Sequence, residues 1–248
     1  TDYGLTKKLT LSVAIGQHLN KSLKEKDVNT SISNSGIGDI IVFPRYDIYN
    51  NTSENIRSEL TLGLGVKVPL GSHTDTVASP SILPEYLPPT IQLSTGGTDI
   101  LLYAFYFREY KKQKFRVFAN SLYIRKGFNS LDDKFGDYTS LSIFASKIFY
   151  RKWGVIAQLK GEVIGQLKAK QSKLDQLGWQ LEEWEDKRDA TGAEKVFFIP
   201  QISYTLNSLT FFVTSEIPLY QNFKGIQFAS QNQFTVGINY RFLTKECE

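Results

Sequence analysis

Apolar and polar residues alternate along much of this chain, and the last segment that does so is the clearest. Every second residue near the end is apolar, and these residues are Phe234, Val236, Ile238, Tyr240 and Phe242. Alternation with a period of two predicts a β-strand with one apolar and one polar face. In a soluble sheet the apolar face meets a core. In a transmembrane barrel it meets lipid, and the polar face lines the lumen.

The same alternation predicts ten strands over the chain. We expect them at residues 9–18, 39–49, 59–70, 99–107, 115–125, 139–150, 153–165, 196–206, 209–219 and 233–242. Several reach the length of about 9–11 residues that a tilted strand needs to cross a bilayer. The segment 99–107 is apolar on both faces, so its pattern leaves open which face points inward.

Short and long connections alternate between these strands. The short ones are 50–54, 110–113, 151–152 and 207–208, and the long ones are 21–36, 72–97, 126–138 and 168–193. Outer-membrane barrels have short periplasmic turns and long extracellular loops. The pattern therefore predicts an all-β fold: an antiparallel up-and-down transmembrane β-barrel, formed as one domain by residues 1–248. Residues 243–248 would be a periplasmic tail, and a soluble β-sandwich is the alternative fold.

Aromatic residues gather beside the short connections, for example at Tyr46, Tyr106, Phe149 and Trp153. Outer-membrane barrels carry aromatic girdles at the two membrane boundaries, although a high strand propensity would also explain aromatic residues in strands. We interpret the last strand, which closes on the aromatic Phe242, as the signal for membrane insertion.

One segment breaks the alternation. Within residues 173–187 the apolar side chains Leu174, Leu177, Leu181 and Trp184 follow a helical spacing. We expect a short amphipathic helix in the extracellular loop 168–193, packed on the barrel rim or available to a partner protein.

Composition excludes several other classes. The net charge is only +4 and the basic residues are scattered, so nucleic-acid binding is not expected. The single cysteine, Cys247, and the two histidines, His18 and His73, have no spacing typical of a metal site, so we expect no metal and no cofactor. Neither histidine has a nucleophile and an acid at recognisable spacing, which argues against an enzyme.

Eight charged residues on the predicted polar faces are candidates for lining the lumen. These residues are Asp39, Arg45, Glu59, Lys67, Lys160, Glu162, Glu216 and Arg241. They would either form a polar pathway that selects solutes by charge and width, or pair with one another as a plug. A barrel of ten or twelve strands has a narrow interior, which favours pairing for most of them.

Five segments together resemble a known family. They are YGLTKKLTLSV at 3–13, SGIGD at 35–39, LGLGVKVPLG at 62–71, TGGTD at 95–99, and PLYQN followed by GIQ within 218–227. In this order they resemble the outer-membrane barrels associated with the meta-cleavage pathway of phenol degradation. Members carry one or two strands before the first segment, so the resemblance implies a 12-stranded barrel of which ten strands are visible here.

The resemblance implies a location in the bacterial outer membrane and a channel or carrier for small molecules, apolar ones included. It names no substrate for this chain. The alternative function is an accessory barrel in a larger outer-membrane assembly. Its partners would be outer-membrane lipid and other outer-membrane proteins, bound through the loops 72–97 and 168–193.

Overall fold

The structure is a computed structural model that describes residues 1–24, 31–76, 86–178, 181–227 and 229–241. Nearly all of its regular structure is β-strand. The strands are β1 (Asp2–Gly4), β2 (Leu9–Lys24), β3 (Ser31–Thr52), β4 (Ile56–Val68), β5 (Asp99–Tyr110), β6 (Phe115–Arg125), β7 (Asp133–Lys134), β8 (Tyr138–Phe149), β9 (Trp153–Ile164), β10 (Lys168–Ala169), β11 (Ala193–Leu206), β12 (Leu209–Phe223) and β13 (Gln233–Tyr240). The helices are α1 (Gln171–Leu177) and α2 (Leu181–Asp189).

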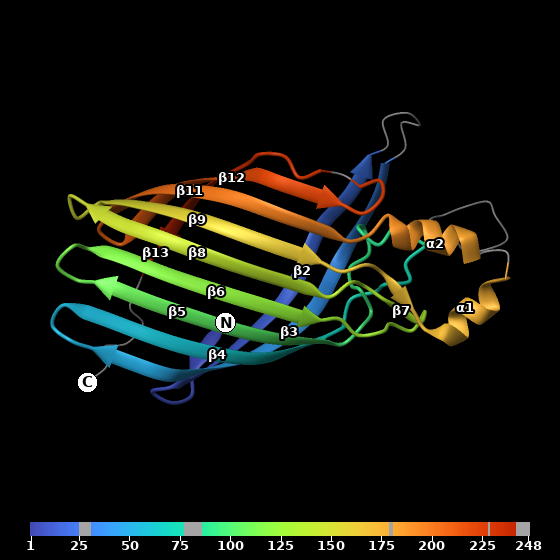
Figure 1. Cartoon of the computed structure of the whole chain (residues 1–248), viewed down its shortest axis with the longest axis horizontal. Helices are drawn as coiled ribbons and strands as arrows, with labels where there is room; N and C mark the ends of the chain where they lie inside the picture. The colour runs from blue at the N-terminus through green and yellow to red at the C-terminus, as the bar shows by residue number, and fades with distance from the viewer. Residues whose placement is uncertain (25–30, 77–85, 179–180, 228, 242–248) are drawn as a thin grey trace.

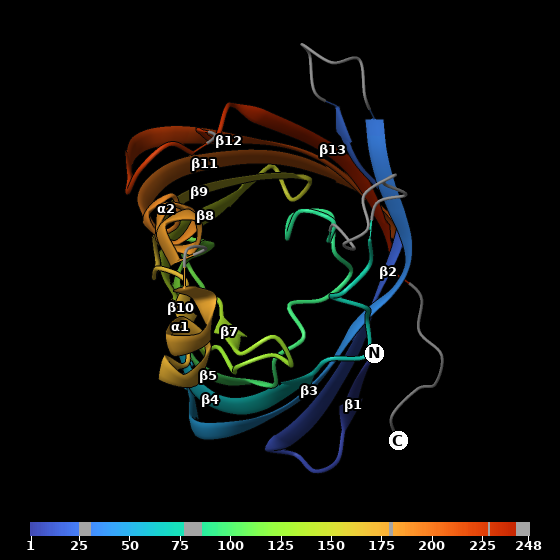
Figure 2. The same cartoon turned by 90° about the vertical axis from the view of Figure 1, so that its right-hand side faces the viewer.

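Eleven strands form one antiparallel sheet in the order β1-β2-β3-β4-β5-β6-β8-β9-β11-β12-β13, and β7 pairs with β10 outside it. Seen along the long axis of the molecule, the strands are arranged as a ring (Figure 2). Within the described residues, β1 pairs only with β2 and β13 only with β12, so hydrogen bonds do not close the sheet. The all-β antiparallel sheet is therefore as expected, whereas the structure leaves barrel closure as a prediction.

All ten predicted strands are present, and β1 is added at the front of the sheet. The expected loop 21–36 was wrong, because β2 continues to Lys24 and β3 begins at Ser31. In this extension Lys21 pairs with Asn34 and Ser22 with Ser33. Polar side chains lie on both faces of this extension, so the sequence shows no alternation there. The backbone pairing of β2 with β3 nevertheless continues. Residue Phe242 and the tail 243–248 lie outside the described residues.

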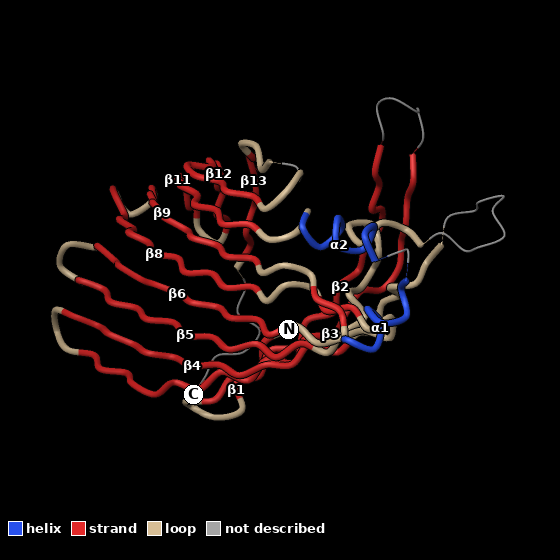
Figure 3. Tube along the Cα trace, turned by 45° about the vertical axis from the view of Figure 1, so that its right-hand side comes forward, coloured by secondary structure: helices blue, strands red, loops and turns tan. Residues whose placement is uncertain are grey.

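The single helix expected over residues 173–187 is two helices, α1 and α2. Gly178 follows α1 with a φ of 52°, a backbone conformation that glycine adopts without strain and that does not continue a helix. The two helices lie at the end of the molecule away from the short turns (Figure 3). The Trp184 indole Nε1 donates to Asp133 Oδ1 at 3.2 Å, and Lys173 Nζ lies 2.6 Å from Asp133 Oδ2. Both helices are thus attached to β7.

The two faces of the sheet differ as the alternation predicted. On β4 the residues Leu62, Leu64, Val66 and Val68 are exposed, while the intervening Gly65 and Lys67 are buried. The open question about β5 is also answered: Ile100 and Leu102 are exposed and Asp99 and Leu101 are buried. We call the exposed set the outer face and the buried or half-buried set the inner wall.

The short connections lie together at one end of the sheet, and the helices and long connections lie at the other (Figure 1). We call these the turn end and the loop end. At the turn end the aromatic side chains Tyr46, Tyr106, Phe149 and Trp153 are exposed on the outer face. No helix among the described residues is long and apolar enough to cross a membrane.

Candidate functional site: the inner wall

A loop segment crosses the space that the strands surround. Residues 86–97 lie within the ring at the loop end (Figure 2). Two lysines from different strands attach this segment to the sheet. Lys21 Nζ of β2 donates to Gln92 O at 2.6 Å, and Lys67 Nζ of β4 donates to Thr95 Oγ1 at 2.7 Å. These contacts also establish that Lys67 belongs to the inner wall.

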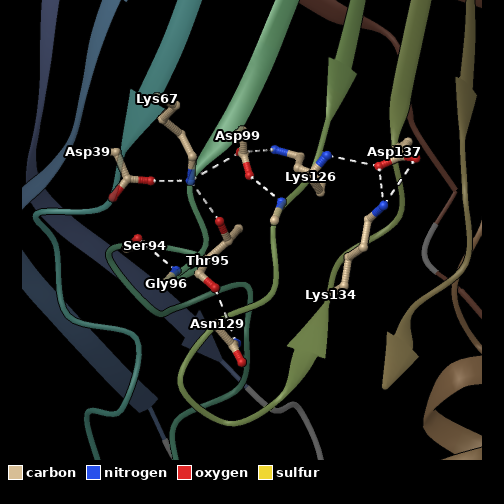
Figure 4. A network of polar contacts seen from close by, with 11 residues as sticks. Asp39, Lys67, Ser94, Thr95, Gly96, Asp99, Lys126, Asn129, Lys134 and Asp137 are labelled. Carbon is tan, nitrogen blue, oxygen red and sulfur yellow. Dashed lines mark hydrogen bonds and ion pairs between the residues drawn. The ribbon is translucent and has the colours of Figure 1, made fainter. Parts of the chain in front are cut away.

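Beside this segment lies a network of buried charges (Figure 4). Asp99 is fully buried, and its Oδ2 lies 3.2 Å from Lys67 Nζ and 3.0 Å from Lys126 Nζ. Lys67 Nζ also lies 2.7 Å from Asp39 Oδ2. A buried carboxylate is costly unless it is paired and hydrogen-bonded, and Gly127 N supplies one more donor to Asp99 at 3.1 Å. The network therefore joins β3, β4, β5 and the connection after β6.

The network ends at the loop end, on Asp137. Burial raises the pKa of this carboxyl, but hydrogen bonds from Lys126 N and from Lys134 outweigh that effect and hold the pKa below its ordinary value. The Lys126 N donor lies 2.8 Å from Asp137 Oδ1, and Lys134 Nζ lies 3.0 Å from the same oxygen. The connection 126–137 is thereby fixed on both sides of its β7 strand.

An unbroken row of aromatic rings crosses the inner wall nearer its middle. The ring centroids are 5.6 Å apart for Phe43 and Tyr103, 6.5 Å for Tyr103 and Phe105, and 6.3 Å for Phe105 and Phe118. Phe118 and Phe144 stack at 4.3 Å. The row spans β3, β5, β6 and β8 and gives this part of the wall an apolar surface. We call these five residues the aromatic row.

Two glycines of β4 provide the room for the first ring of this row. A Cβ atom on Gly65 would lie 2.5 Å from Phe43 Cδ2, and one on Gly63 would lie 2.7 Å from Phe43 Cζ. The ring of Phe43 therefore lies directly over the β4 backbone. The small residues that alternate with the exposed Leu62, Leu64 and Val66 explain why this ring fits.

A second polar cluster lies on β8 and β9. Lys160 Nζ is 2.6 Å from Glu162 Oε1, and the Tyr138 hydroxyl donates to the same oxygen at 2.6 Å. Lys160 Nζ also lies 5.7 Å from the centroid of the buried Phe197 ring, a distance at which a cation is attracted by a ring. This cluster is separate from the network around Asp99.

Six of the eight residues predicted to line the lumen are paired on the inner wall. Among the eight, the structure brings together Asp39 with Lys67 and Lys160 with Glu162. Arg45 Nη2 lies 3.0 Å from Asp2 Oδ1, and Glu59 contacts Arg57. Their role in lining a passage stays a prediction.

The remaining two lie at the other edge of the sheet. Glu216 is half-buried on β12, and Arg241 is exposed directly after β13. The predicted insertion signal is exposed along β13, with Phe234 at 75%, Val236 at 77%, Ile238 at 62% and Tyr240 at 65%. Its last residue, Phe242, lies outside the described residues.

The aromatic row was not predicted, because the inward-facing positions were expected to be polar or small. The signal was present: Phe43 is two residues from Arg45, and Phe144 lies between Ser142 and Ser146, in the same register. Asp99, which ends the TGGTD segment at 95–99, and Lys126 were not among the residues predicted to line the lumen.

His73 Nε2 is 2.9 Å from the Ser130 hydroxyl, but no carboxylate among the described residues orients the histidine as a base needs. Likewise, no group of three or more histidine, cysteine or acidic side chains in these residues could hold a metal ion.

Comparison with known proteins adds a structural relationship. No protein-family model matches the chain, and no curated protein matches it. Among solved structures, the fold is similar to that of an outer membrane channel from Pseudomonas putida F1, with a TM-score of 0.62 over 96% of this chain and 79% of the channel. The sequences are 14% identical, so the similarity is one of fold. The association with phenol degradation stays a prediction.

Proposed function

We propose that this protein is a β-barrel of the bacterial outer membrane that passes small, largely apolar molecules along its inner wall. The aromatic row carries the proposal. Its five rings form a continuous apolar surface on the face turned away from the exposed apolar side chains. Solutes that water hydrates poorly would move from ring to ring with little loss of contact.

The membrane location has separate support. Leu64, Ile143, Val213 and Val236 are apolar, lie on four different strands, and are 50% exposed or more on the outer face. Soluble proteins rarely expose apolar patches of this extent, whereas lipid would cover them. The sorting of short turns to one end, and the fold shared with an outer membrane channel, point the same way.

The barrel would be completed by pairing between β13 and the strands β1 and β2. An exposed sheet edge in a membrane would leave backbone groups without hydrogen bonds, which lipid does not tolerate. The segment 86–97 would narrow the passage at the loop end, where Lys21 and Lys67 hold it across the interior.

The charged clusters would mainly stabilise the inner wall and would not line the route of the solute. Asp99 forms ion pairs with Lys67 and Lys126. Glu162 forms an ion pair with Lys160 and accepts a hydrogen bond from Tyr138. On this proposal the protein is not an enzyme and needs no cofactor.

The test is uptake of small neutral aromatic compounds into vesicles that contain the purified protein. Replacing both Phe105 and Phe118 by leucine keeps the wall apolar but removes the central rings. We expect uptake to fall several-fold. The matched control is Phe211→Leu, because Phe211 is exposed on the outer face, and it should leave uptake unchanged.

A wild-type protein that neither carries such compounds nor conducts ions in planar bilayers would contradict the transport proposal. In that case an accessory role in a larger outer-membrane assembly would be favoured. Extraction in mild detergent would then yield a stable multi-protein particle rather than a monomer.

A further inference from the structure

A cationic hollow lies on the outer face at the loop end of β5 and β6. It has a volume of about 230 Å³, and its lining includes Ile100, Arg125, Phe128 and Lys134. Arg125 is the register partner of Ile100, which is 44% exposed, so both side chains project from the outer face. The hollow is therefore on the opposite side of the sheet from the buried Asp99.

Arg125, which lines the hollow, and Lys168, which lies outside its lining, are not neutralised. Within the described part of the chain, the side chains of Arg125 and Lys168 make no ion pair or hydrogen bond. Lys168 lies directly opposite Lys134 in the pairing of β10 with β7. Like charges directly opposite one another destabilise a sheet, and Asp137 neutralises Lys134 but not Lys168.

The nearby carboxylates are already engaged. Asp137 binds Lys134 and the backbone of Lys126, and Asp99 is turned inward to Lys67 and Lys126. Neither is available to Arg125 or Lys168. An excess of positive charge therefore remains at the mouth of the hollow.

An exposed apolar strip continues from the hollow toward the middle of the sheet. Ile100 and Leu102 of β5 are 44% and 48% exposed, and Val66 and Leu64 of β4, their register partners, are 40% and 57% exposed. A cationic end followed by an apolar strip matches a molecule with an anionic head and hydrocarbon chains.

We propose that the hollow binds a phosphate of a phosphorylated lipid in the outer leaflet of the membrane. Arg125 presents a planar guanidinium that can bind two phosphate oxygens, and Lys168 and Lys134 flank it. The acyl chains lie along Leu64, Val66 and Leu102. This site rests on the proposed membrane location but does not depend on transport.

The test is binding of lipid A to the purified protein in detergent, counted by native mass spectrometry. The wild-type protein should retain lipid A that carries its phosphates and should not retain the dephosphorylated form. The double variant Arg125→Gln, Lys168→Gln should bind about tenfold more weakly or worse, because a hydrogen bond to a charged group contributes that much.

The matched control is Lys147→Gln. Lys147 is an exposed lysine on β8 whose Nζ lies over Phe149, at the turn end. This variant should bind lipid A as the wild type does. Equal binding by the double variant, or equal retention of dephosphorylated lipid A by the wild type, would overturn the site. Inorganic phosphate that binds as tightly as lipid A would also overturn it, because the site would then take a free anion.

The transport assay, made on the same preparations, separates the two proposals. Phosphate-dependent lipid binding without uptake would contradict the transport function and support the lipid site. Uptake without phosphate-dependent lipid binding would support the transport function and contradict the lipid site.

Discussion

Small residues decide where bulky ones can lie on the inner wall. Gly65 is buried beneath the Phe43 ring, whereas Gly161 on β9 lies opposite the exposed Leu141 on the outer face and has open space where a side chain would begin. The two glycines lie within strands but differ in what surrounds them. Their substitution by alanine therefore separates the effect of close packing from the general effect of replacing a glycine.

Gly65→Ala should destabilise the protein by about 1–3 kcal/mol, because the added methyl group overlaps the Phe43 ring and forces it to move. It should also reduce uptake of aromatic compounds, since Phe43 begins the aromatic row. Gly161→Ala should be neutral or slightly stabilising. Urea unfolding in detergent micelles measures both, and equal effects of the two variants would contradict this account of the packing.

One of the short turns holds two residues in a backbone conformation that they do not favour. In the turn between β8 and β9, Tyr150 and Arg151 have φ angles of 47° and 61°. Residues with a Cβ atom adopt this left-handed region at a cost of about 1–2 kcal/mol each. The turn between β11 and β12 instead uses Asn207 at a φ of 54°, which suits asparagine better.

Replacing Tyr150-Arg151 by Asn-Gly should raise the free energy of unfolding by about 1 kcal/mol, because these residues favour the tight hairpin turn. Asn207→Gly is the control and should change it less. The measurement is again the midpoint of urea unfolding at equal m-value. No gain from the double substitution would mean that the exposed Tyr150 side chain stabilises the protein in another way, such as by anchoring at the membrane boundary.

The whole molecule presents an apolar outer face, and the proposed location places this face against lipid. Ile143 is 51% exposed near the middle of β8, and Thr139 is exposed near the loop end of the same strand and face. In a soluble sheet an arginine at either position would reach water. In a bilayer the two positions lie at different depths.

Ile143→Arg should therefore cost about 2–4 kcal/mol and Thr139→Arg about 0–1 kcal/mol when the protein is unfolded from lipid vesicles. The inward Ser142 is left unchanged, so the inner wall stays intact in both variants. Similar small effects at the two positions would favour a soluble sheet and contradict the proposed location.

Periodicity along the sequence was enough to predict the strands, their two faces and the placement of the short turns, but not the extension of β2 and β3 into residues 21–36. These features depend on the period of the side chains along each segment and on local turn residues. Leu62, Leu64, Val66 and Val68 could therefore be assigned to one face without a structure. The helix over residues 173–187 was assigned to the correct loop, but Gly178 divides it.

Which inward side chains meet depends on the way the strands are aligned in the folded sheet. Asp39, Lys67, Asp99 and Lys126 come from segments about thirty residues apart and come together because strand register and sheet curvature place them at one level. The aromatic row depends on the same alignment of neighbouring strands. Alternation specifies the side of the sheet that a residue faces, but not the register between neighbouring strands. This register determines which side chains come into contact on the inner wall.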